Sequence, residues 1–199
     1  VAASEVTEVL PLMKVSDYLT WLAESILNQV VMLAWEPLVE RHGRPSRTDG
    51  QPCSPDFVVA GYGKLGGIEL GHNSDLDLVF LHDAASGGVT DGDKPVSNEQ
   101  FYARLGQRII HILSTRTMSG QLYEVDTRLR PSGSAGLLVS SMDSFEKYQL
   151  NDAWTWEHQA LVRARVVAGC NQARARFDAI RHQVLCAERP LDKLREDVL

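Results

Sequence analysis

The sequence predicts an α/β (α+β) protein, in which a small mixed sheet is flanked by an N-terminal helix and a C-terminal helical region. Three observations support this fold class. Apolar residues recur at helical spacing in the first forty residues, two short apolar runs with strand character follow, and a capped amphipathic helix comes next. With 199 residues, 44% of them hydrophobic, the chain can bury a sizeable core without disulfides.

The first forty residues are predicted to be helical. The apolar face is expected to carry residues at three- and four-residue steps, namely Leu19, Leu22, Ile26, Val30 and Leu33. Ser16 is the expected N-cap, and Pro37 marks a stop or a kink. Residues 42–55 hold three prolines and two glycines, which is the composition of a linker or loop. We therefore expect a domain boundary in this segment.

Two strands and a helix are predicted to follow. The strands cover residues 57–60, which lead into the glycine-rich segment 61–67, and residues 76–81. Ser97 and Gln100 have capping-box spacing at the start of the helix. Its apolar face consists of Phe101, Leu105, Ile109, Ile112 and Leu113, and Gly120 is expected to end it.

A third strand is predicted over residues 122–129, where side chains alternate in character. One side carries Tyr123, Val125, Thr127 and Leu129, and the other carries Glu124, Asp126 and Arg128. From about residue 141 the chain is predicted to be mostly helical, with a helix around Phe177, Ile180 and Val184. The charged segment 191–199 has a helix-like pattern. Because it ends the chain and Val1 begins it, we expect a piece of a longer protein.

Composition excludes several classes of protein. Twenty Lys and Arg against 26 Asp and Glu give a net charge of −6, which argues against nucleic acid as a partner. The three cysteines have neither zinc-ligand nor disulfide-framework spacing. There is no apolar stretch long enough to cross a bilayer and no leader peptide. We expect a cytoplasmic protein with no membrane association.

Asp75 and Asp77 are the first candidates for chemistry. They lie two residues apart at the start of a predicted strand, so both carboxylates should lie on one face. Carboxylates directed into an apolar strand are costly unless a cation or hydrogen-bond donors compensate them. Asp126 offers a third carboxylate on a separate strand. Three such groups can hold two Mg²⁺ ions for phosphoryl chemistry, whereas a single Asp is usually a solvated strand end.

The glycine-rich segment 61–67 lies ahead of this pair. Its glycines allow backbone N–H groups to approach a phosphate, although such a segment can also be just a tight turn. It is not a P-loop, because Leu65 and not Ser or Thr follows Lys64. The ten-residue gap between Lys64 and Asp75 makes the pattern more specific.

Gly63, this gap, residues 75–78 and the later pair Val125-Asp126 resemble the nucleotidyltransferase superfamily, which includes DNA polymerase beta. That superfamily usually has Gly or Ser where this chain has Lys64. Residues 61–70 and 74–80 resemble one branch closely, the bacterial glutamine synthetase adenylyltransferases, which also remove the adenylyl group. Segments 123–133 and 153–165 are similar to its C-terminal, adenylylating half.

The resemblance implies a polymerase beta-like fold and a reaction. AMP would pass from ATP to a tyrosine hydroxyl of glutamine synthetase, pyrophosphate would leave, and Asp75, Asp77 and Asp126 would be metal ligands for Mg²⁺. A PII-type signal protein is the implied regulatory partner of the full-length enzyme. The alternatives are phosphorolytic adenylyl removal, for which the N-terminal half is the better candidate, and a protein-binding fragment without turnover.

Five further residues are candidates for binding the nucleotide: Gly63, Lys64, Ser74, Arg128 and Arg130. Guanidinium groups bind phosphate oxygens bidentately, and a lysine can act as a point charge. The alternatives are a solvated lysine, arginines paired with Glu124 or helix carboxylates, and a serine that caps a turn.

The segment boundaries follow from these motifs. Residues 1–50 form an N-terminal helical segment and linker, residues 51–150 the nucleotidyltransferase catalytic domain, and residues 151–199 the start of a C-terminal helical domain. We interpret Trp154 and Trp156 as packing between the catalytic and helical regions, with nucleotide binding by Arg163 or Arg165 as the alternative. His72 and His82 are expected to be surface residues.

Overall fold

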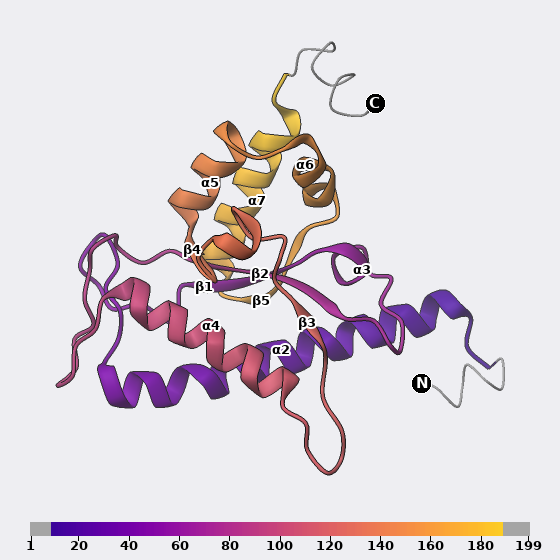
Figure 1. Ribbon diagram of the computed structural model, residues 1–199, viewed down its shortest axis with the longest axis horizontal. Helices are drawn as coiled ribbons and strands as arrows, with labels where there is room; N and C mark the ends of the chain where they lie inside the picture. The colour runs from indigo at the N-terminus through magenta and orange to yellow at the C-terminus, as the bar shows by residue number, and fades with distance from the viewer. Residues whose placement is uncertain (1–8, 189–199) are drawn as a thin grey trace.

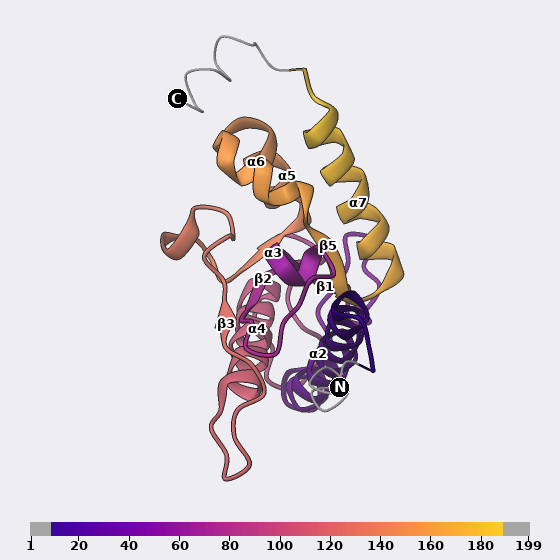
Figure 2. The same cartoon turned by 90° about the vertical axis from the view of Figure 1, so that its right-hand side faces the viewer.

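The computed structural model describes residues 9–188 as a five-stranded mixed sheet with helices on both faces (Figure 1 and Figure 2). This confirms the predicted fold class. In chain order, the elements are α2 (Leu12–His42), β1 (Phe57–Gly61), α3 (Gly63–Gly66), β2 (Leu76–His82), α4 (Asn98–Ser114), β3 (Val125–Asp126), a 3₁₀ turn η1 (Gly133–Ala135), β4 (Val139–Ser141), α5 (Met142–Asn151), α6 (Thr155–Val162), β5 (Arg165–Gly169) and α7 (Asn171–Cys186). Between residues 9 and 188, no helix combines the length and the apolar run needed to cross a membrane.

The sheet has the strand order β3-β2-β1-β5, and β4 also pairs with β2. β1 is antiparallel to β2 and β5, whereas β3 and β4 run parallel to β2. β3 pairs with the first residues of β2, and β4 pairs with its last residues. Since Gly61 lies opposite Leu78, the glycine-rich turn that follows β1 lies beside the beginning of β2.

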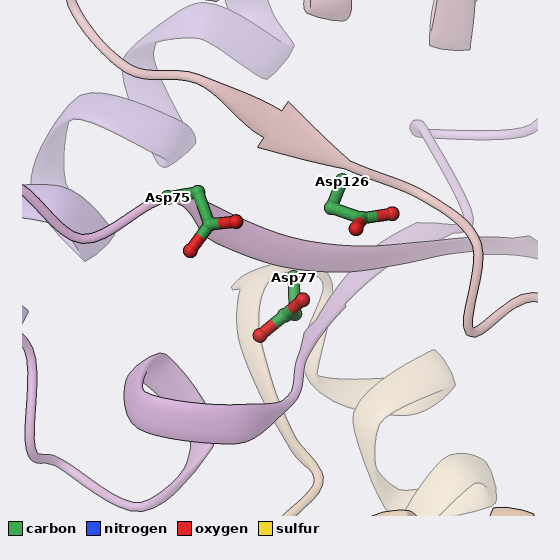
Figure 3. A group of neighbouring side chains, drawn as sticks. All are labelled: Asp75, Asp77 and Asp126. Carbon is green, nitrogen blue, oxygen red and sulfur yellow. The ribbon is translucent and has the colours of Figure 1, made fainter.

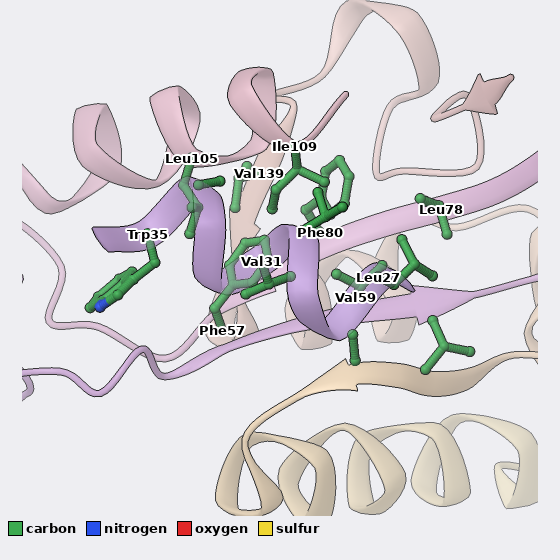
Figure 4. Packing of buried hydrophobic residues seen from close by; sticks show 14 of the residues in the cluster. Leu27, Val31, Trp35, Phe57, Val59, Leu78, Phe80, Leu105, Ile109 and Val139 are labelled. Carbon is green, nitrogen blue, oxygen red and sulfur yellow. The ribbon is translucent and has the colours of Figure 1, made fainter. Parts of the chain in front are cut away.

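Two hydrophobic cores enclose the sheet. Alternate residues of β1 point to opposite faces, as the strand period of two requires: Phe57 and Val59 pack in the core under α2 and α4, and Val58 and Ala60 pack in the core under α5–α7. Figure 4 shows Leu27 and other α2 residues packed against the sheet from the first side. The N-terminal segment therefore shares a core with the strands, and the predicted boundary near residue 50 stays a prediction.

Helix α2 differs from its predicted form in three ways. It begins at Leu12 with Pro11 as N-cap, not at Ser16, and it continues through Pro37. The expected apolar face is partly wrong, because Leu22 and Leu33 are exposed, while the buried residues include Ala23, Leu27, Val31, Ala34, Trp35 and Leu38. A proline inside a helix costs about 3 kcal/mol. Trp35 and Leu38, two residues before and one residue after Pro37, are buried in the core, and their burial opposes this cost.

Helix α4 confirms its predicted cap, since the Ser97 side chain accepts a hydrogen bond from the Gln100 amide. It ends at Ser114, however, and not at Gly120. Thr115 caps it by donating its hydroxyl to the His111 carbonyl. Gly120 belongs to a separate turn with Thr117.

The predicted strand 122–129 is reduced to Val125–Asp126. The Asp126 carboxylate accepts a hydrogen bond of 2.8 Å from the Arg128 amide, so the chain turns directly after Asp126. Aspartate commonly ends a strand in this way, because its side chain bonds to the backbone two residues later.

The C-terminal part is helical as predicted, except for residues 165–169, which form β5 and pair with β1. The described residues end at 188, so the helix-like pattern of 191–199 lies outside them. Trp154 and Trp156 are 67% and 54% exposed, so their interpretation as packing residues is wrong. His82 is also not a surface residue: it is 3% exposed, its ring stacks on Tyr102, and burial lowers its pKa to about 4.

Candidate functional site

Three carboxylates meet at the beginning of β2. Asp75 directly precedes the strand, Asp77 is its second residue, and Asp126 lies beside Asp77 in the parallel register of β3. One oxygen from each lies within 4.8 Å of the others. Figure 3 shows the three side chains next to one another, two from the β2 segment and one from β3. The structure thus brings together the three aspartates that were predicted as metal ligands.

Gly63 allows the turn after β1 to pass close to Asp77. Its φ of +53° is in the left-handed region, and a Cβ at this position would collide with Asp77 Oδ2. The Tyr62 amide donates a 2.9 Å hydrogen bond to the Asp77 carbonyl, which fixes the turn on the strand. Only glycine fits both conditions without strain.

The surroundings change the pKa of two of these aspartates in opposite directions. Burial raises the pKa of Asp77, and the charges of Asp75 and Asp126 add to this rise. The guanidinium of Arg128 holds the pKa of Asp126 below its ordinary value, mainly by hydrogen bonding. Among residues 9–188, no arginine or lysine forms an ion pair with Asp77. The carboxylate oxygens and the excess negative charge of the three aspartates fit a hard divalent cation such as Mg²⁺.

The predicted phosphate-binding arginines have protein partners in this structure. Arg128 forms an ion pair with Asp126, and its Nε donates at 2.8 Å, so its partner is a carboxylate of the site itself and not Glu124 or a helix carboxylate, the alternative partners considered above. Its side chain is 78% exposed. Arg130 donates to the carbonyl and hydroxyl of Thr127 at 2.8 and 2.9 Å, and to carbonyls of Ser134 and Gly136. It fixes the loop that follows β3.

Lys64 and Ser74 both precede the three aspartates in the chain. Lys64 is exposed, and its charge lowers the pKa of Asp77 slightly against the larger opposing effects. The Ser74 hydroxyl accepts a 3.1 Å hydrogen bond from the Gly71 amide, so it caps a turn. A pocket of about 320 Å³ opens next to Asp75, lined by residues 72–75 and 121–124.

Arg165 supports the glycine-rich turn from the neighbouring strand β5. Its guanidinium donates to the carbonyls of Leu65 and Gly66 at 3.0 and 3.1 Å and forms an ion pair with Glu24 of α2. From the sequence, Arg165 was predicted only as a possible nucleotide ligand, and its support of this turn was not predicted. No local signal could have shown it, because the partners lie about 100 residues apart in the chain.

Arg163 also contacts this turn, from the end of α6. It lies against Gly67 and forms an ion pair with Glu69. In contrast to Arg165, its side chain is 46% exposed, and that of Glu69 is 62% exposed. Neither arginine is placed among the three aspartates.

Comparison with known proteins gives the family of this chain. The family model described as glutamate-ammonia ligase adenylyltransferase matches residues 1–180. The chain belongs to this family. Over 198 residues it is 64% identical to proteins of Pseudomonas putida and Pseudomonas aeruginosa that are named bifunctional glutamine synthetase adenylyltransferase/adenylyl-removing enzyme. A protein of Hahella chejuensis with the same name is 56% identical over 199 residues. These matches cover 100% of this chain and 20–21% of each relative, so the chain spans about a fifth of their length.

Proposed function

We propose that this chain carries an adenylyl-transfer centre that acts on glutamine synthetase. AMP passes from ATP to a tyrosine hydroxyl: a bond forms between the tyrosine oxygen and the α-phosphorus, the bond from that phosphorus to pyrophosphate breaks, and the phenol proton is lost. The names of the relatives support the substrate. The observation that carries the proposal is the cluster of Asp75, Asp77 and Asp126 within the part of the chain that matches the family.

Asp75, Asp77 and Asp126 are the residues that would hold Mg²⁺, and their spacing allows a pair of ions to be shared. Mg²⁺ bound there would neutralise phosphate charge and stabilise the entering and leaving oxygens. The negative charge of Asp77 is disfavoured by burial and by the two neighbouring carboxylates, which raise its pKa. Its raised pKa is thus a cost that a bound cation removes.

The chain's own cations and glycines would position the nucleotide. Gly63 keeps the turn open beside Asp77, so that phosphate can approach the backbone there. Lys64 and Arg128 are exposed at the same edge of the sheet and can bind phosphate oxygens. Arg128 would bind phosphate in place of Asp126 if the Asp126 carboxylate held a metal ion. Arg130 and Ser74 remain predicted nucleotide ligands, although each already serves a turn or loop.

The remaining parts of the proposal concern the longer protein. The similarity of segments 123–133 and 153–165 to the adenylylating half supports the proposal that this chain lies in the C-terminal half of the bifunctional enzyme. A PII-type signal protein is then a regulatory partner of the whole enzyme, which acts in the cytoplasm and needs no nucleic acid or membrane.

Transfer of radioactive label from ATP to glutamine synthetase tests this proposal. With Mg²⁺, label at the α-phosphate should appear on glutamine synthetase and label at the γ-phosphate should not. Asp77→Asn should abolish the transfer, whereas Asp93→Asn, which changes an exposed loop carboxylate, should leave it unchanged.

Two results would contradict the proposal. One is label transfer from the γ-phosphate, which would indicate a kinase. The other is activity only in the removal direction, with ADP released from adenylylated glutamine synthetase in the presence of phosphate. The second result would assign the chain to the alternative, adenylyl-removing function.

A further inference from the structure

Helices α2 and α4 form the layer that covers one face of the sheet (Figure 1). A second pocket is lined by residues of both helices. Its volume is about 440 Å³, and its polar lining includes Arg41, His42, Arg104, Arg108 and His111. It shares no residue with the aspartate cluster or with the pocket beside Asp75. In a chain with a net charge of −6, this is a local concentration of positive charge.

Within the described part of the chain, the three guanidinium groups of this pocket have no carboxylate partner. Among residues 9–188, none of Arg41, Arg104 and Arg108 forms an ion pair. Arg104 and Arg108 are four residues apart on α4, a spacing at which like charges face each other unfavourably. Arg41 lies in the last turn of α2, where the helix dipole favours a cation. That explanation does not apply to Arg104 and Arg108, which lie inside α4.

His42 fixes Arg104 at the pocket. It is 5% exposed, and its Nδ1 lies 2.8 Å from the Lys94 carbonyl. Because a carbonyl can only accept, Nδ1 carries the proton and donates it. In the neutral ring Nε2 is then the acceptor for Arg104 Nη1 at 2.9 Å. A buried residue thus holds one guanidinium in place, which reduces the entropy that Arg104 loses when it binds a ligand.

We propose that this pocket binds a small, multiply charged oxyanion. Guanidinium groups match the oxygens of phosphate and carboxylate bidentately. Three guanidiniums from two packed helices around one concave space suit a ligand with at least two charges. Polyphosphates and polycarboxylates both present several anionic oxygens of this kind. The experiment below distinguishes these two classes of ligand. The site is independent of the adenylyl-transfer centre.

Calorimetric titration of the 199-residue chain tests this assignment, with EDTA present and at low ionic strength. The probes are inorganic phosphate, pyrophosphate and citrate. Saturable binding of pyrophosphate without citrate binding assigns the site to phosphates, and the reverse assigns it to carboxylates. Arg104→Gln and Arg108→Gln should each weaken the binding about tenfold or more. Arg116→Gln removes the same charge from an exposed loop residue outside the pocket and should not.

Two further measurements make the result specific. Asp77→Asn should leave the affinity unchanged, because the aspartate cluster is a different site. Circular dichroism should show the native helix content in both pocket variants. Arg108→Gln is the milder of the two changes, because it leaves the contact between Arg104 and His42 in place. The proposal is overturned if no probe binds, if both pocket variants bind like the wild type, or if only a glutamate-rich peptide binds, which would indicate a protein contact.

Discussion

At the scale of single residues, Asp77 and Asp126 form a matched pair with opposite electrostatic surroundings. The pKa of Asp77 is raised by burial and like charges, and the pKa of Asp126 is lowered by Arg128. Without metal, Asp77→Asn should therefore raise the free energy of unfolding at pH 7, and Asp126→Asn should lower it, each by about 0.2–1 kcal/mol, the size of an exposed charge pair.

The two aspartates should also change the dependence of folding stability on pH in opposite directions. Ionised Asp77 is disfavoured in the folded state, so its contribution to stability falls as pH rises through the carboxyl range. Asp126 contributes stability at neutral pH that is lost as pH falls below its ordinary pKa. Urea unfolding of both variants and the wild type between pH 3 and pH 7, with EDTA, measures these differences. Changes of the same sign for both variants would contradict the assignment.

Gly63→Ala should damage the site more than the fold. Any non-glycine residue with φ near +53° is strained by about 1–2 kcal/mol, and here the Cβ also displaces Asp77. We expect AMP transfer to fall at least about tenfold, since small displacements of a catalytic group are costly. Gly87→Ala is the matched control, with a φ of +68° and no atom within 4 Å of its Cβ. It should lose similar stability and keep its activity, and equal losses of activity would disprove the role of Gly63.

At the scale of elements, the short helix α3 depends on Arg165 of β5. Arg165→Gln removes two bonds to α3 carbonyls and the ion pair with Glu24. We expect unfolding to become easier by about 1.5–3 kcal/mol, the value for hydrogen bonds to charged groups, and the apparent KM for ATP to rise.

Arg163→Gln is the control for this prediction, because its ion pair with Glu69 is exposed. Such a pair contributes about 0–1 kcal/mol. Chemical denaturation and steady-state kinetics on both variants measure the effects. A larger effect at Arg163 would show that the turn is held from α6 and not from β5.

The elements that were predicted from sequence are those with strong local signals. β1, β2 and the start of α4 have apolar runs or a cap within a few residues, and they form as expected. β5 was missed because residues 165–169 become a strand only by pairing with β1, more than 100 positions earlier. The three aspartates could be predicted to meet, since each lies at a strand. The pairing of Arg128 with Asp126 and the support of α3 by Arg165 depend on how the elements are placed in the folded chain. Residue spacing in the sequence does not indicate either contact.

At the scale of the whole molecule, α2 and the sheet share one core, which predicts that they unfold together. Leu27→Ala should lower the free energy of unfolding by about 2–5 kcal/mol, because Leu27 is fully buried. Unfolding followed by fluorescence and by circular dichroism should remain a single transition. Leu33→Ala, on the 57% exposed side chain of the same helix, should cost no more than about 0.5 kcal/mol. Two separate transitions in the wild type would instead support the domain boundary near residue 50.

Asp75, Asp77 and Asp126 are proposed to hold the cation with which ATP binds. Calorimetric measurement of ATP affinity, with Mg²⁺ and with EDTA, in the wild type and in Asp77→Asn tests it most directly. We expect Mg²⁺ to strengthen ATP binding to the wild type at least about tenfold, equivalent to about 1.4 kcal/mol, and Asp77→Asn to lose most of this gain. An equal gain in both proteins would contradict the claim, because the cation would then bind ATP without these carboxylates.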